Sequence, residues 1–147
     1  MIQDVDIQEI YSKIKSPEAS AALEKIMAFV SSENKFDLDC RERWDSRKKG
    51  FLYDILFFDG EKQNLYAIIP TQKWLLWYFR KPALKTSFQG IHNTDSIKEK
   101  LGKEIYSHNR DENEKRYAKV NENEKGEITI RLLNPANAQN LIDKYLQ

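Results

Sequence analysis

The chain has 147 residues, of which 40% are hydrophobic and 32% charged, and its formal net charge is +1. These values predict one soluble globular domain over residues 1–147, large enough to bury a core without a metal or disulfide. No apolar run in the sequence approaches the roughly 20 residues of a membrane span. The single cysteine, Cys40, excludes an intramolecular disulfide, so we predict a reducing, cytoplasmic location.

The first third of the chain predicts two helices. Apolar residues recur at helical spacing from Ile7 to Ile14 after a capping residue, Asp6. A second helix begins at Ser16-Pro17, a serine N-cap followed by proline, and runs to about Ser32. The pair is expected to form a helical hairpin that packs on a larger element.

From Lys35 the apolar period changes from helical to alternating, which predicts strands. Phe36, Leu38, Cys40 and Trp44 share one face of the first strand. Further strands are predicted over residues 51–58, 65–70 and 73–80, with short links that favour an antiparallel meander. The turn after residue 58 contains Asp59, which we interpret as part of a polar hairpin tip.

Residues 81–93 predict a loop, and Thr94 is expected to cap a helix over residues 95–101. Short strands at 116–120 and 126–133 and a last helix from Pro135 complete the order ααββββαββα. Because strands are grouped, the predicted fold class is α+β, with a mainly antiparallel sheet of five to six strands.

The segment "KWLLWYFR", residues 73–80, is apolar on both faces of its strand. Trp77 lies on one face of this strand, and Trp74 and Tyr78 lie on the other. One face is expected in the core, and the other must meet a ligand, a helix or another protein. Arg80 lies on the same face as Trp74 and Tyr78. Because an arginine prefers solvent, we expect this face to be the one nearer solvent.

No complete catalytic, nucleotide-binding or metal motif occurs, so we expect no cofactor and favour a protein without enzymatic activity. Two polar residues are weak candidates for a site. Asp54 interrupts an apolar strand and is expected to pair with an arginine or to face water. His92 lies in a loop before a helix, where it is expected to be a surface residue.

Cations and aromatic residues concentrate in the middle of the chain. Residues 41–103 carry thirteen Lys or Arg and seven Asp or Glu, a net charge of +6. The predicted candidate surface comprises Arg41, Arg43, Trp44, Tyr53, Tyr66, Trp74, Trp77, Tyr78, Arg80 and Lys81.

Three functions of different class fit this surface. The first is a binding domain that docks a second copy of itself, as a homodimer, or another protein through an aromatic sheet face. The second is a nucleic-acid-binding accessory protein, since aromatic side chains with cationic rims bind single strands. The third is a small-molecule pocket between sheet and helices, lined by Trp44, Trp74, Trp77, Tyr53 and Tyr66.

Overall fold

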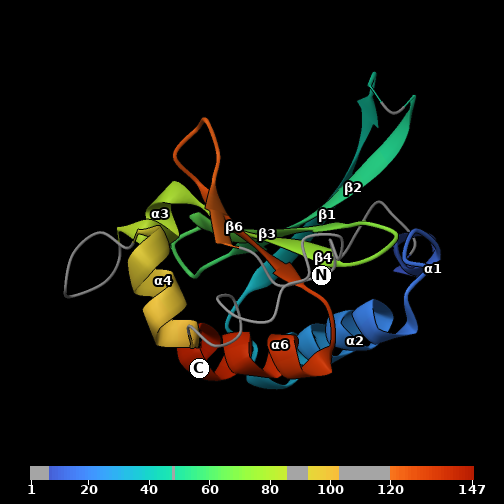
Figure 1. The fold of residues 1–147 in the computed structure, drawn as a ribbon. Coiled ribbons are helices and arrows are strands. Elements are labelled where there is room, and N and C mark those ends of the chain that lie inside the picture. Colours follow the sequence, from blue (N-terminus) through green and yellow to red (C-terminus); the bar gives the residue numbers. More distant parts are fainter. Residues whose placement is uncertain (1–6, 48, 86–92, 103–119) are drawn as a thin grey trace, which may run out of the picture.

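The fold is α+β and consists of one antiparallel sheet covered on one face by helices (Figure 1). It was obtained as a computed structural model, which describes residues 7–47, 49–85, 93–102 and 120–147. The helical elements are α1 (Ile7–Ser12), α2 (Pro17–Glu33), α3 (Lys81–Leu84), α4 (Thr94–Leu101), α6 (Pro135–Leu141) and the π-helical turn η1 (Ile142–Leu146). The strands are β1 (Asp37–Asp45), β2 (Gly50–Phe58), β3 (Asn64–Pro70), β4 (Leu75–Phe79), β5 (Val120–Glu122) and β6 (Ile128–Leu132).

The sheet has the spatial order β1-β2-β3-β4-β6-β5, and every neighbouring pair is antiparallel. Strands β1 to β4 form the predicted meander. The chain then leaves the sheet through α3 and α4 and returns so that β6 pairs with β4 and β5 forms the outer edge. Segments distant in sequence therefore become neighbours at the β4–β6 pair.

Helix α2 begins and ends at signals that are visible in the sequence. The Ser16 side chain accepts a hydrogen bond from Ala19 N, Pro17 occupies the first turn, and Asn34 ends the helix in the left-handed conformation. Its apolar stripe is buried and lies beside α6 beneath the sheet (Figure 1). The buried stripe comprises Ala19, Ala22, Leu23, Ile26 and Val30.

Alternate residues of each strand point into the layer between sheet and helices. In β4 these are Leu75, Trp77 and Phe79, whose exposed fractions are 0%, 0% and 2%. The rings of Phe57 and Tyr66 pack against Trp77 with centroid separations of 5.2 and 5.0 Å. The expected parity of β4 is confirmed: the Trp77 face is core, and Leu76 and Tyr78 on the opposite face are only half-buried.

Several local predictions differ from the structure. Residues 81–84, expected in a loop, form the single-turn helix α3, with Pro82 in its first turn. Helix α4 is capped by Asn93 and not by Thr94, because Asn93 and Ser96 form a reciprocal capping box. Only Val120 of the predicted strand 116–120 belongs to the described residues, where it begins β5.

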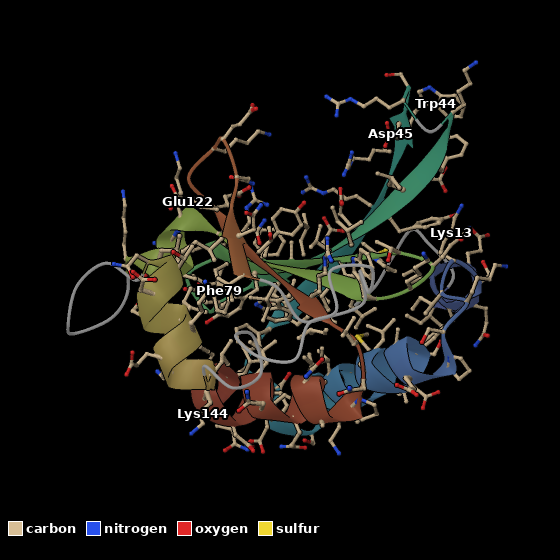
Figure 2. All side chains as sticks on the ribbon, in the orientation of Figure 1. Lys13, Trp44, Asp45, Phe79, Glu122 and Lys144 are labelled. Carbon is tan, nitrogen blue, oxygen red and sulfur yellow. The ribbon has the colours of Figure 1, made fainter. Side chains whose placement is uncertain are left out.

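Trp44 lies on the predicted face of the first strand, but it is not buried with the other residues of that face. The residue has the parity of Leu38 and Cys40, which are buried, yet 57% of Trp44 is exposed. The β1–β2 hairpin extends past the helical layer, and its end points away from α2 and α6 (Figures 1 and 2). Alternation fixes the face on which Trp44 lies, whereas the extent of the helices decides whether that face is covered.

Candidate functional site

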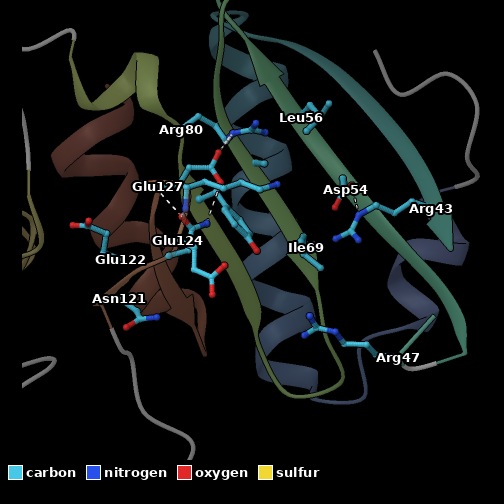
Figure 3. A pocket seen from close by; sticks show the side chains of 14 residues that line it. Arg43, Arg47, Asp54, Leu56, Ile69, Arg80, Asn121, Glu122, Glu124 and Glu127 are labelled. Carbon is cyan, nitrogen blue, oxygen red and sulfur yellow. Dashed lines mark hydrogen bonds and ion pairs between the residues drawn. The ribbon is translucent and has the colours of Figure 1, made fainter. Parts of the chain in front are cut away.

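The face of the sheet opposite α2 and α6 is hollowed. The β1–β2 hairpin and the β5–β6 hairpin both rise on this side, and the central strands lie between them (Figure 1). Two adjoining hollows, of about 770 and 710 Å³, share Arg43, Ile69 and Tyr78 as lining residues. We call this surface the open face; Figure 3 shows the part of it near β5 and β6.

The floor of the open face is apolar. Leu56 and Ala67 are buried in it, whereas Ile69, Leu76 and Tyr78 on β3 and β4 remain half-buried. These residues alternate with core residues along each strand, which is why an apolar run such as β4 supplies both faces. A half-buried aliphatic floor can contact a further apolar surface.

Two ion pairs border Tyr78 on this floor. Arg43 Nε lies 2.8 Å from Asp54 Oδ2 on the β1–β2 side, and Arg80 pairs with Glu127 on the β4–β6 side (Figure 3). Burial is the main cause that raises the pKa of the Tyr78 hydroxyl. The charges of Glu127 and Asp54 raise it further, and those of Arg43 and Arg80 partly oppose them. Tyr78 is therefore a neutral hydroxyl, able to donate and accept, between two fixed pairs of charges.

The β5–β6 hairpin is held by Asn123. Its Oδ1 accepts hydrogen bonds from Lys125 N and Glu127 N, each at 2.9 Å, and its Nδ2 donates to Glu127 Oε1 at 3.1 Å. Gly126 takes a φ of 80°, which the turn requires and which side chains rarely adopt. Glu127 is thereby oriented by Asn123 at one carboxylate oxygen while the other meets Arg80.

The opposite end of the open face is basic. Its hollow is lined by Lys13, Arg43 and Lys73, with no acidic side chain among its lining residues. Trp74 also lines it, and the Arg131 guanidinium carbon lies 4.2 Å from the centroid of the Trp74 ring. The β5–β6 end carries Glu122, Glu124 and Glu127 together with Arg80 and Lys125, so charge along the open face changes from basic to mixed.

An exposed aromatic pair borders the open face, and one of its members, Phe51, lines the basic hollow. Trp44 and Phe51 pair near the end of the β1–β2 hairpin with ring centroids 5.2 Å apart, and they are 57% and 46% exposed. Residues 41–51 carry five Lys or Arg and two acids. This hairpin, defined here as the basic arm, presents aromatic and cationic side chains together (Figure 2).

The predicted surface residues separate into three groups. Arg43, Trp74, Tyr78 and Arg80 meet on the open face, together with Asp54, and Lys81 lines a smaller hollow beside Arg80. Arg41 and Trp44 belong to the basic arm. Tyr53, Tyr66 and Trp77 lie in the core with exposed fractions of 7%, 8% and 0%, so the structure does not place them on a surface.

The small-molecule pocket predicted between sheet and helices is not assembled from the residues proposed for it. Trp77 and Tyr66 pack against each other inside the core, and the Tyr53 hydroxyl donates to Glu9 Oε2 at 3.0 Å. Trp74 lines the open face and Trp44 lies near the end of the basic arm. His92 lies outside the described residues.

Several residues of the open face were not predicted from sequence. Glu127 and Arg131 come from β6 and its approach, and Asn123 from the turn before it. Only the pairing of β6 with β4 brings Arg131 to Trp74. The open-face positions of Ile69 and Leu56 could have been predicted, because each points to the side of its strand opposite the core residues.

Known protein families, characterised proteins and solved structures were compared with the chain, and none matches. Among the described residues, no three His, Cys, Asp or Glu side chains are grouped as a metal site. No helix in the same part of the chain is long and apolar enough to cross a membrane.

Proposed function

We propose that the protein is a non-enzymatic binding domain that holds another protein on its open face. The observation that carries this proposal is the half-buried apolar floor of Ile69, Leu76 and Tyr78 between two raised hairpins. An apolar centre with a rim of charged groups is the usual arrangement of a protein-binding surface. The single buried thiol, Cys40, supports a reducing, cytoplasmic setting as part of the same proposal.

The hollow shape favours a partner that differs from the open face itself. Two copies that meet open face to open face would hold their floors apart, because both hairpins rise from each. A strand, a loop or a helix of another protein would reach the floor, with acidic groups toward Lys13 and Lys73.

Affinity capture with matched variants tests this proposal. Leu76→Glu places a charge on the half-buried floor, and Lys25→Glu changes an exposed residue of α2 on the other side of the molecule. Both variants are first checked for a native circular dichroism spectrum. A partner that is retained by the wild type and by Lys25→Glu but lost with Leu76→Glu supports the proposal. If every captured protein is retained equally by all three, the open face is not the binding surface.

The basic arm favours nucleic-acid binding as a second candidate function. An exposed aromatic pair on a hairpin of net positive charge supplies stacking and phosphate attraction. Fluorescence anisotropy with single- and double-stranded oligonucleotides at low salt is expected to show binding that weakens as salt is raised. Trp44→Ala and Arg47→Glu should each weaken it, whereas Lys25→Glu should not. Absence of binding at low salt removes this candidate.

A small molecule in the hollow remains the third candidate. Tyr78 between two ion pairs offers a hydroxyl and charges of both signs to a polar ligand. A thermal-shift screen is the direct test, and a hit must lose its effect in Tyr78→Phe to be assigned to this place.

A further inference from the structure

The basic end of the open face is a hollow of about 710 Å³, and none of its lining residues is acidic. Of its three cations, Arg43 is already paired with Asp54. Among the described residues, Lys13 and Lys73 have no carboxylate within ion-pair distance. Glu9, four residues before Lys13, instead accepts a hydrogen bond from a core tyrosine. Two positive charges at this hollow are therefore not balanced by the chain that surrounds them.

The β3–β4 turn presents one of these cations beside an aromatic ring. Thr71 Oγ1 accepts hydrogen bonds from Lys73 N at 3.3 Å and from Trp74 N at 3.1 Å, and it donates to Trp74 O at 2.7 Å. These bonds fix the backbone of the turn at both residues. A partner that binds here meets a cation and a ring that are already in place, which lowers the entropy cost of binding.

The second cation is brought to the same turn by the segment that links α1 to α2. Lys15 N and Ser16 N both donate to Gln72 O, at 2.9 and 3.0 Å. This contact docks the link on the β3–β4 turn and holds Lys13 at the hollow. Lys13 and Lys73 therefore come from distant parts of the sequence and line one hollow.

Apolar side chains line the rest of the hollow. They come from β2, β3, β4 and the turn before β4, and they comprise Phe51, Leu52, Ile69, Trp74 and Leu76. Phe51 is 46% exposed, and Trp44, which packs on it, is 57% exposed. Large exposed apolar groups beside a hollow are typical of a surface that buries a partner's side chain.

From this combination we infer that the partner on the open face is a protein segment in which acidic residues flank a bulky apolar residue. The apolar side chain packs against Phe51 and Trp74, and the carboxylates on either side meet Lys13 and Lys73. The apolar anchor supplies most of the affinity, and the charges set the orientation and speed of association. This inference rests on the proposed binding of another protein to the open face, and it specifies the chemistry of that partner.

The lining of the hollow favours a protein segment over a nucleic acid at this place. Leu52, Ile69 and Leu76 are aliphatic, whereas single strands bind by stacking on aromatic side chains along a continuous positive groove. The adjoining hollow carries three glutamates beside Arg80 and Lys125. Such a mixed charge does not attract a chain of phosphates along the open face.

Peptide selection with a charge-reversed variant tests the chemistry of the partner. A displayed library of random short peptides is selected on the wild type and, separately, on the double variant Lys13→Glu with Lys73→Glu. The wild type is expected to enrich peptides in which Asp or Glu adjoins Phe, Trp or Leu. The double variant should enrich Lys or Arg beside the same apolar residues, because its rim has the opposite charge. Peptides of equal net charge from the two selections overturn the inference.

Fluorescence anisotropy with a labelled peptide from the wild-type selection then locates the contacts. Lys73→Glu and Phe51→Ala should each weaken binding about tenfold or more, and the loss in Lys73→Glu should shrink as salt is raised. Lys25→Glu, on the helical side of the molecule, should bind as the wild type does. Each variant is first checked for a native circular dichroism spectrum. An oligonucleotide that displaces the peptide would assign the hollow to nucleic acid and overturn the inference.

The result with Leu76→Glu separates this inference from the proposed function. Peptides that fail to bind Leu76→Glu but carry no excess of acidic residues overturn the acidic partner, and they leave the open face as the binding surface. Peptides that bind Leu76→Glu as tightly as the wild type, or a selection that enriches no peptide, count against both.

Discussion

Arg43 on β1 reaches diagonally across the sheet to Asp54 on β2, with Nε and Oδ2 2.8 Å apart. The residue directly opposite Asp54 is Arg41, but Arg41 pairs instead with Asp39 of its own strand. The sequence left open whether Asp54 pairs with an arginine or faces water, and the pair with Arg43 decides between them. Asp54 thus interrupts an apolar strand at the place where the open face begins.

This ion pair should contribute little to folding. Arg43 is about half exposed, and exposed pairs are worth roughly 0.2–1 kcal/mol. Asp54→Asn is therefore expected to lower the free energy of unfolding by less than about 1 kcal/mol in urea denaturation at neutral pH. Raising the salt concentration should reduce the difference. A loss above about 2 kcal/mol would mean that the pair belongs to a more strongly coupled network.

Two tryptophans of opposite environment provide a direct test of the core. Trp77→Ala removes a side chain that is 0% exposed and packs against Phe57 and Tyr66, and it should cost about 3–5 kcal/mol. Trp44→Ala removes an exposed ring and should cost about 1 kcal/mol or less, chiefly its contact with Phe51. Equal losses in urea denaturation would contradict the assignment of the two faces.

The elements and faces of the sheet could be predicted because both depend on local spacing. Alternation placed Trp77 and Phe79 on one face and Trp74 and Tyr78 on the other; the first two are buried together, and the last two line the same hollow. The composition of the site depends on pairing between distant segments. Only the β4–β6 pair brings Glu127 to Arg80 and Arg131 to Trp74, and spacing within β4 carries no information about β6. Exposure of Trp44 likewise depends on where the helices end.

The cap of α4 gives a test that distinguishes two adjacent residues. Asn93 Oδ1 accepts from Ser96 N at 2.8 Å, and Ser96 Oγ accepts from Asn93 N at 2.9 Å. Asn93→Ala removes the cap and should lower the free energy of unfolding by about 1 kcal/mol. Thr94→Ala, at the first helical position, should change it by a few tenths of a kcal/mol. The reverse order of effects would restore Thr94 as the cap.

The Cys40 thiol should react slowly in the folded protein. Burial, followed by the charges of Asp39 and Asp54, raises its pKa to about 11, and its side chain is 1% exposed. Because the thiolate is the reactive form, little of it exists at pH 8. Labelling with a thiol-specific disulfide reagent is expected to be slow in buffer and rapid in denaturant. Equally rapid labelling in both would show that β1 opens readily at Cys40.

Alkaline pH should destabilise the fold through its buried tyrosines. Burial raises the pKa of Tyr66 and Tyr145 to about 12, and burial with the hydrogen bond to Glu9 raises that of Tyr53 to about 12. In the unfolded chain these hydroxyls titrate near the ordinary value of 10. Between pH 10 and 12 the unfolded state therefore binds fewer protons than the folded state, and stability falls as pH rises.

Urea midpoints measured from pH 7 to 11.5 should therefore be level at first and then decline above about pH 10. Each of the three tyrosines contributes a slope of at most about 1.4 kcal/mol per pH unit in this interval. Tyr66→Phe removes one ionisable group and should make the decline shallower while changing stability little at pH 7. Tyr78→Phe is the comparison on the half-buried open face, where we expect a smaller change in slope. A midpoint that rises between pH 10 and 11.5, or a decline that Tyr66→Phe leaves unchanged, would show that the ring of Tyr66 is accessible to solvent in the folded chain.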